Sequence, residues 1–334
     1  MGLWIAVVAA LAFSATNGIQ DAANAIATLV ATRGARPAQA LAVAATFNML
    51  GAVVVSTAVA GTIAGIVTVA PRDAVAVIGA GLAGATAWNA LAWSRTLPSS
   101  SGHALVGGLV GSGLADAGLH SVRWGGLAGM RPVGVLGVLI ALAVTPVLGL
   151  AFGLGVSRLA QVVLRRATHA VDAPIRAAEW VMSAALSFSH GANDAQKSMG
   201  AISAMLLATG HLQAFSVPFW VKLACGGVLT VGTALGGWRI VRKVGRGIIR
   251  LAPIDGLSSQ TASTAVILAA SYFGAPVSTT HVVSSSIVGV GGGQRRWRHV
   301  RWTVVRSMGL AWILTLPGAA ILAAVTLAVW KGVA

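Results

Sequence analysis

The chain has 334 residues, of which 56% are hydrophobic and only 9% are charged, and its formal net charge is +16. Soluble domains carry about a quarter charged residues, so this composition excludes an ordinary soluble protein and indicates a polytopic membrane protein. The cations stand in short segments between apolar runs, which argues against nucleic-acid binding. The single cysteine excludes an intramolecular disulfide.

Apolar runs fill both halves of the chain, and a spanning helix needs about 20 mostly apolar residues. In the first half we expect runs at Leu3–Ala31, Ala38–Val59, Val75–Trp93, Ser99–Leu114 and Pro132–Val156. In the second half we expect runs at Ile175–Thr209, Val217–Trp238, Ser258–Phe273, Val277–Gly289 and Val304–Val329.

Five runs per half is an odd number, so the second half should be inverted relative to the first. The predicted fold is an all-α polytopic membrane protein with two inverted-topology repeats of about five spans each, containing Ser/Thr-rich broken or hairpin helices. Residues 1–156 form the first repeat, 157–174 a basic cytoplasmic connector, and 175–334 the second, inverted repeat.

The distribution of cations sets the expected orientation. With the N-terminus outside, the cytoplasmic turns hold 17 of the 23 lysines and arginines and the outer segments hold four. Cytoplasmic loops carry an excess of cations, so this bias predicts a cytoplasmic (inner) membrane protein with both termini outside. A re-entrant fourth run with an even number of crossings per half would place the basic cluster Arg158–Arg176 outside, and is disfavoured.

A polar segment recurs inside an apolar run of each half. Gly18–Asn24 (GIQDAAN) is repeated 173 positions later as Gly191–Lys197 (GANDAQK). Carboxylates at membrane depth are expensive, so the duplicated Asp21 and Asp194 indicate a polar site, with a helix-break cap or a pair with Lys197 as the structural alternative. The oxygen acceptors suited to Na⁺ or a proton are Asp21, Asp194 and the amides of Gln20, Asn24, Asn193 and Gln196.

A second duplicated motif supplies hydrogen-bond donors. Pro98–His103 (PSSSGH) and Pro276–His281 (PVSTTH) each place a proline and hydroxyl residues before a helix-like run. Helix N-termini with hydroxyl caps offer donors and a partial positive charge to an oxyanion, although capping alone would also explain the motif. The candidate anion-binding hydroxyls are Ser99, Ser100, Ser101, Ser278, Thr279 and Thr280. His103, His190 and His281 more often orient backbone than bind a ligand.

These four segments, in this order, resemble the inorganic phosphate transporter (PiT) family, with bacterial low-affinity permeases as the nearest type. The resemblance spans nearly the whole chain and implies uptake of inorganic phosphate with Na⁺ or H⁺ by alternating access. It implies that the hydroxyl motifs face phosphate and that Asp21, Asn24, Asn193 and Asp194 belong to the ion site, as Na⁺ ligands if Na⁺ is the coupling ion. Gln20, Gln196 and Lys197 complete that site, with Asn17 and the three histidines as supporting residues.

The sequence departs from the family pattern at two positions. Gly102 stands where the family often has serine, and the second acidic motif ends in Gln196-Lys197 rather than an Ala-Asn pair. The Gln-Lys ending resembles proton-coupled bacterial members, some of which carry a divalent metal with phosphate, and this favours H⁺ over Na⁺. We expect no cofactor beyond the coupling cation.

The candidate partners are inorganic phosphate, membrane lipid, a second copy of the chain in a homodimer and a PhoU-like cytosolic accessory protein. A symporter for another oxyanion such as sulfate stays open as an alternative. An anion channel would need no gradient. An intramembrane hydrolase is disfavoured because each histidine follows its serine cluster on the same element, a poor geometry for a nucleophile and its base.

Overall fold

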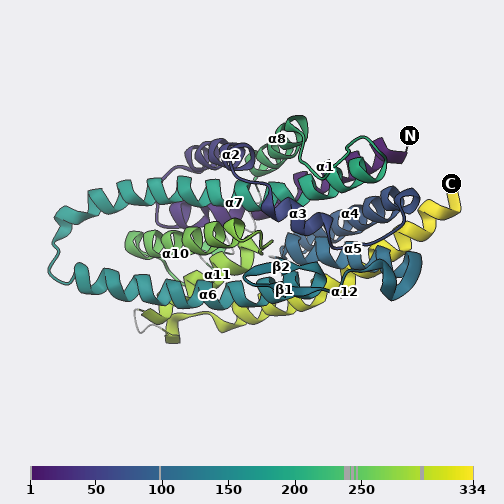
Figure 1. The fold of residues 1–334 in the computed structure, drawn as a ribbon. Coiled ribbons are helices and arrows are strands. Elements are labelled where there is room, and N and C mark those ends of the chain that lie inside the picture. The colour runs from purple at the N-terminus through teal and green to yellow at the C-terminus, as the bar shows by residue number, and fades with distance from the viewer. Residues whose placement is uncertain are drawn as a thin grey trace.

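The protein is helical almost throughout in a computed structural model, which describes residues 2–97, 99–236, 241, 244–245, 247–293 and 297–333 (Figure 1). The helices of the first half are α1 (Gly2–Ala31), α2 (Pro37–Val54), α3 (Ala58–Ala64), α4 (Pro71–Ser94), α5 (Ser101–Ala117) and α6 (Gly134–Val163). Those of the second half are α7 (Asp172–Ala208), α8 (Phe219–Leu235), α10 (Pro253–Tyr272), α11 (Thr279–Gly293) and α12 (Trp302–Val333).

Short elements connect these helices. Strands β1 (Gly126–Ala128) and β2 (Arg131–Val133) form an antiparallel hairpin before α6. Single 3₁₀ turns occur at η1 (Gly118–Ser121), η2 (His169–Val171) and η3 (Trp297–His299).

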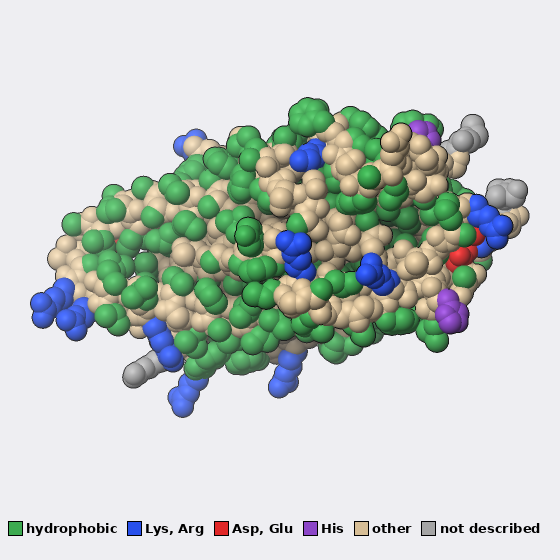
Figure 2. Space-filling model, viewed as in Figure 1, with side chains coloured by type: hydrophobic (Ala, Val, Ile, Leu, Met, Phe, Trp, Pro, Cys, Tyr) green, Lys and Arg blue, Asp and Glu red, His purple; other side chains and the backbone are tan. Residues whose placement is uncertain are grey.

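Several helices have the length and composition of membrane spans. Among the described residues these are α1, α2, α4, α6 and α12. Hydrophobic side chains cover much of the face shown in Figure 2, and lysines and arginines gather at the end where α6 and α7 meet. The chain is therefore an all-α polytopic membrane protein, as its composition predicts.

The predicted run Ala38–Val59 is divided into two helices. Helix α2 ends at Val54, the next residue is extended, and the short α3 begins at Ala58. The dividing residues, Val55-Ser56-Thr57, are β-branched or carry a hydroxyl that competes for backbone hydrogen bonds, so they form helix less readily than their neighbours.

The third and fourth predicted runs form a helical hairpin. The outer ends of α4 and α5 lie together, because Thr68 N donates to Ser121 O at 2.7 Å. The turn between the helices lies beside the middle of α1, where Gln20 Nε2 donates to Leu97 O at 3.5 Å. Helices of 17 and 15 residues, α5 and the equivalent α11, reach about 25 Å or less. The hydrocarbon core is about 30 Å thick, so neither helix crosses it alone.

This arrangement differs from the interpretation of the third and fourth runs as two separate crossings. The expected cytoplasmic turn with Arg95 lies instead near the level of Gln20, well before the end of α1. A stretch of apolar residues has the same periodicity in a separate crossing and in a hairpin whose tip ends inside the protein, so only contacts with other helices distinguish the two.

The two halves exchange helices, and glycines stand at the crossings. Helix α1 of the first half packs on α8 of the second, and α7 of the second packs on α2 of the first. A Cβ atom added at Gly51 would collide with the backbone of Phe188, and one at Gly232 would collide with that of Ala15. Each glycine removes a side chain where two backbones touch, which is how small residues let membrane helices approach closely.

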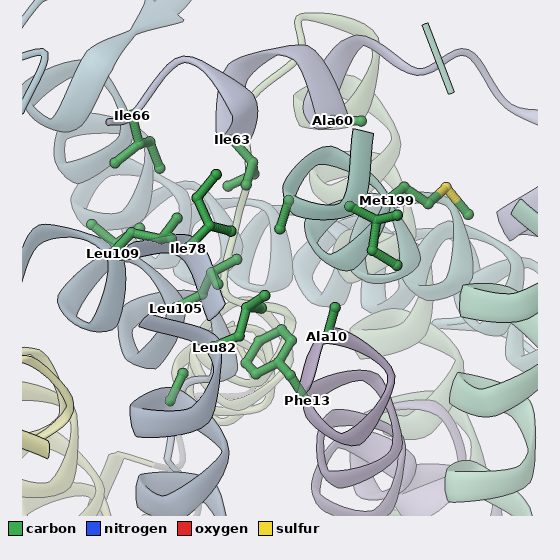
Figure 3. Close-up of a cluster of buried hydrophobic side chains, with 14 of the residues drawn as sticks. Ala10, Phe13, Ala60, Ile63, Ile66, Ile78, Leu82, Leu105, Leu109 and Met199 are labelled. Atoms are coloured by element: carbon green, nitrogen blue, oxygen red, sulfur yellow. The ribbon is translucent and has the colours of Figure 1, made fainter. Parts of the chain in front are cut away.

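The hydrophobic core lies between these exchanged elements. Figure 3 shows Phe13 of α1 against Leu82 of α4 and Leu105 of α5, with Met199 of α7 nearby. All four side chains are fully buried. Because the core draws residues from both halves, neither half can keep its interior covered without the other.

Helices α6 and α7 extend into the predicted connector 157–174, since they reach Val163 and Asp172. Some residues counted for the orientation or named in the motifs lie outside the described residues. These are Pro98, Trp238, Arg239, Arg242, Lys243, Arg246, Arg295 and Arg296.

Candidate ion and anion site

Two buried carboxylates lie at the centre of the molecule. Asp21 is in the second half of α1 and Asp194 is in the middle of α7, and both are about 1% exposed or less. One oxygen atom of each carboxylate and a ring nitrogen of His190 all lie within 4.8 Å of one another. The duplicated acidic motifs, 173 positions apart in sequence, therefore meet in space.

The first acidic cluster surrounds Asp21 with neutral donors. Oδ1 accepts from Asn24 Nδ2 at 2.9 Å and from Thr280 Oγ1 at 2.7 Å, and Oδ2 accepts from Ser101 Oγ at 3.0 Å. Asn24 lies one helical turn along α1, whereas Ser101 and Thr280 are in the first turns of α5 and α11. Helix α11 packs on α10 as α5 packs on α4, so α10 and α11 form a second hairpin. The tips of both hairpins thus reach the same carboxylate.

The second acidic cluster surrounds Asp194 with basic groups. Lys197 Nζ forms an ion pair with Oδ1 and donates to Val277 O at 2.9 Å. His190 Nε2 lies 2.8 Å from Oδ2, and Thr279 Oγ1 donates to the same oxygen at 3.1 Å. His190, Asp194 and Lys197 are spaced i, i+4 and i+7, so the 3.6-residue period places them on one face of α7.

Asn24 links the two clusters. Its Nδ2 lies 3.1 Å from Thr279 Oγ1 and 3.0 Å from Thr280 Oγ1, and both threonines also donate to carboxylates. Two hydroxyls of α11 are therefore shared between Asp21, Asn24 and Asp194. A cation or anion bound here would act on both halves at once.

Ser100 and Ser278 cap the hairpin helices. Ser100 Oγ accepts from His103 N at 3.2 Å, and Ser278 Oγ accepts from His281 N at 3.3 Å. The rings of His103 and His281 lie together, with centroids 4.7 Å apart. The equivalent serines and histidines of the two motifs thus fix the helix starts and hold the tips against each other.

Ser99 has a different environment from the other hydroxyls. Its Oγ lies 2.7 Å from Thr315 Oγ1 of α12 and accepts from Trp88 Nε1 at 3.1 Å. Of the six predicted hydroxyls, those that converge on the carboxylates are Ser101, Thr279 and Thr280.

The amides before the two aspartates hold the hairpin turns. Asn193 Nδ2 donates to Ala275 O at 3.1 Å, and Val277 N donates to Asn193 Oδ1 at 3.2 Å. Gln20 makes the corresponding contact with Leu97 O in the other half. Gln196 is farther along, where its Oε1 accepts from Ala60 N of α3 at 3.1 Å.

Some supporting residues escaped the sequence analysis. Asn48 Oδ1 of α2 lies 3.0 Å from His190 Nδ1, and Asn48 Nδ2 donates to Thr233 Oγ1 at 3.0 Å. Ser271 Oγ accepts from Asn193 at 2.9 Å. A lone asparagine inside the apolar run of α2 is the one signal that could have marked Asn48, because a buried amide needs partners.

Comparison with known proteins identifies the family. The chain matches the Phosphate transporter family twice, over residues 17–178 and 165–323. A probable low-affinity inorganic phosphate transporter of Rhizobium meliloti (strain 1021) is 41% identical over 95% of this chain and 93% of its own length. A protein of the same description from Bacillus subtilis (strain 168) is 36% identical over 96% of this chain and 94% of its own length.

A solved structure supports the same assignment. It is described as "The sodium-dependent phosphate transporter" and superimposes with a TM-score of 0.86 at 25% identity, covering 100% of both chains. The two family matches agree with the duplicated motifs, and the predicted resemblance is confirmed. These relatives are transporters and not enzymes, and the chain belongs to the phosphate transporter family.

Proposed function

We propose that the protein imports inorganic phosphate across the cytoplasmic membrane by cation symport with alternating access. The observation that carries the proposal is the convergence of both hairpin tips on two buried carboxylates. Asp21 binds Ser101 of one hairpin and Thr280 of the other, so the site belongs to both halves. The names of the relatives, which are phosphate transporters, support phosphate as the substrate.

The two kinds of group divide the chemistry. Helices α5 and α11 both begin at the site, and a helix N-terminus offers unpaired N–H groups and a partial positive charge to an oxyanion. The carboxylates and amides offer oxygen to a cation. Phosphate therefore binds at the two helix starts, and the coupling cation, H⁺ or Na⁺, binds at the carboxylates.

The charges explain why a cation must accompany phosphate. Two carboxylates and one lysine leave the site with a charge of −1 when His190 is neutral (−2 + 1 = −1). A phosphate anion adds at least one more negative charge in a medium where charges are poorly solvated. A co-bound cation lowers this electrostatic penalty, so symport is favoured over uniport.

The arrangement of helices suits an alternating-access mechanism. In Figure 1, α1 runs from the N-terminus toward the end where α6 and α7 meet, and α7 runs back in the opposite direction. Opposed helices of this kind are expected of the inverted repeats that we propose for residues 1–156 and 175–334, joined by 157–174.

Two cavities of the protein contain arginine side chains. One of about 340 Å³ contains Arg123 and Arg131 and includes Gly274, next to the turn that leads to α11. The other, of about 610 Å³, contains Arg33, Arg250 and Arg301 beyond the end of α1. Positive cavities concentrate anions, so we propose that phosphate enters through the first and leaves through the second.

The excess of lysine and arginine in the predicted cytoplasmic turns supports an orientation with both termini outside and the connector in the cytoplasm. The homodimer and the PhoU-like accessory protein stay predictions.

A single experiment tests the proposed function: uptake of labelled phosphate into proteoliposomes, with Na⁺ and pH gradients imposed separately and sulfate as a competitor. We expect uptake to follow one gradient and to resist sulfate. Flux that ignores both gradients would contradict symport, and strong inhibition by sulfate would make sulfate the substrate.

A further inference from the structure

The internal duplication allows the two acidic clusters to be compared position by position. An offset of 173 relates the acidic motifs, and an offset of 178 relates the hydroxyl motifs. Both clusters keep the aspartate and one hydroxyl, Ser101 or Thr279, that donates to it. The remaining positions differ. The pairs are Asn17 with His190, Asn24 with Lys197, and Gly102 with Thr280.

The first cluster contains oxygen atoms that lack partners. Among the described residues, the side-chain oxygens of Asn17, Gln20 and Asn24 are buried without a hydrogen-bond partner. Each of these residues is 2% exposed or less. Buried polar atoms are nearly always satisfied, and these carbonyl oxygens belong to α1 residues within about one helical turn of Asp21. Carboxylate and amide oxygens are the ligands of a hard cation, and a proton carrier such as hydronium would use the same acceptors.

The second cluster already contains a cation. The ammonium of Lys197 is fully buried and is bonded to Asp194 and to Val277 O. The equivalents of Gln20 and Asn24 in this half are Asn193, whose oxygen accepts from Val277 N, and Lys197 itself. The position of a coordinating amide is thus taken by a covalently attached positive charge.

Gly102 lies beside this ammonium. A Cβ atom at Gly102 would lie 3.6 Å from Lys197 Nζ and 3.4 Å from Val277 O. In the other half, the equivalent Thr280 donates its hydroxyl to Asp21. A threonine at position 102 would therefore bring its branched side chain against the ammonium. The glycine and the lysine form one complementary pair.

We propose that the ammonium of Lys197 permanently occupies the second cation position, so that the coupling cation enters and leaves only at the Asp21 cluster. This inference rests on the proposed cation symport and deepens it. A protein with an asparagine in both clusters would bind and release a cation at each carboxylate in every transport cycle. Because Lys197 replaces one of these asparagines, this protein exchanges one cation fewer per cycle. Lys197 is then a specificity-determining residue for the number of coupling ions.

The test restores the composition of the first cluster in the second. The variant K197N/G102T gives Asp194 the amide and the hydroxyl that Asp21 has. Binding of ²²Na⁺ to purified protein in detergent is measured at saturation, with size-exclusion chromatography to confirm that each variant is folded. We expect the variant to bind one Na⁺ per protein more than the wild type. An unchanged number of bound ions in a folded variant would overturn the proposal.

The wild-type protein provides a second measurement that does not depend on the double variant. Its bound ²²Na⁺ should not exceed one per protein and should be lost in D21N. Two bound ions, or saturable binding that persists in D21N, would overturn the proposal. The reciprocal variant N24K should bind no Na⁺, because the first cluster then also contains an ammonium. Binding of Na⁺ by N24K would contradict the inference that an ammonium takes the place of the exchanged cation.

These binding counts are independent of transport. If the wild-type protein moves no phosphate in proteoliposomes but K197N/G102T gains one Na⁺, the proposed function fails and the assignment of Lys197 stands. If phosphate uptake is coupled to a gradient but the variant gains no ion, the proposed function stands and the assignment of Lys197 fails.

Discussion

The two halves of the molecule agree at their helix crossings and differ at their carboxylates. Gly51 meets the backbone of Phe188, and Gly232 meets that of Ala15, at equivalent positions of the two halves. Around Asp21 and Asp194, by contrast, the amide and hydroxyl groups of one acidic cluster correspond to lysine, histidine and glycine in the other cluster. Packing fixes where the backbones lie, and it leaves the side chains that face the polar centre free to differ. The duplication therefore supplies a symmetric scaffold for an asymmetric site.

The largest expected effect on uptake is that of Asp21→Asn. The amide keeps the shape of the side chain but removes the negative charge of the first cluster, where we place the exchanged cation. Loss of a buried charge interaction of about 3 kcal/mol corresponds to roughly a 100-fold loss of uptake. Labelled phosphate uptake in proteoliposomes measures it. Asp73→Asn, which changes a carboxylate paired with Arg72 at 3.3 Å outside the site, is the matched control and should transport normally.

Asp194→Asn should reduce both uptake and stability. It leaves the fully buried ammonium of Lys197 without its carboxylate, and breaking a buried ion pair costs about 3–5 kcal/mol. Thermal unfolding of the purified protein, followed by tryptophan fluorescence, should show a lower Tm than for Asp21→Asn. The double variant D194N/K197M removes both charges and should recover most of the Tm without recovering uptake. Equal Tm values for the two single variants would contradict the proposal that only Asp194 is paired with a buried cation.

The crossing glycines should respond alike. Gly51→Ala and Gly232→Ala each force two helix backbones apart, and overpacking of this kind costs about 1–3 kcal/mol. Thermal unfolding should show similar losses for both. Gly227→Ala in α8 is the control, because no described atom outside its own stretch of helix lies within 4 Å of the added Cβ, and it should not destabilise the protein. A large effect at only one crossing would show that the scaffold is asymmetric too.

The smallest effects on uptake at the site are expected from the hydroxyls that contact the carboxylates. Ser101→Ala removes one of three donors to Asp21. Because two donors remain, we expect the lower end of the range for a hydrogen bond to a charged group, about 1.5 kcal/mol, which is equivalent to a rise of roughly 10-fold in half-saturation. Thr279→Ala should have a weaker effect, since Asp194 keeps Lys197 and His190. The concentration dependence of uptake on phosphate and cation measures both. A stronger effect at Thr279 would reverse the predicted order.

Some features of the site could be predicted from sequence alone. The duplicated aspartates stand out because polar residues are rare in such apolar runs, and the equivalent spacing in both halves indicates that they act together. The hydroxyl motifs are recognisable by proline and serine or threonine before a helix. What the motifs did not distinguish was the role of each hydroxyl, because Ser99, Ser100 and Ser101 are consecutive and their directions depend on where the helix begins.

The sequence by itself determined the class of the protein, its duplication and the repeated acidic and hydroxyl motifs of its polar centre, because these depend on composition, local periodicity and repeated motifs. The tertiary structure decided that α4–α5 and α10–α11 are hairpins, that the halves exchange helices, and that Gly102 lies beside Lys197. These contacts join residues far apart in the chain, and they arise from the close packing of helix surfaces, which no local pattern encodes.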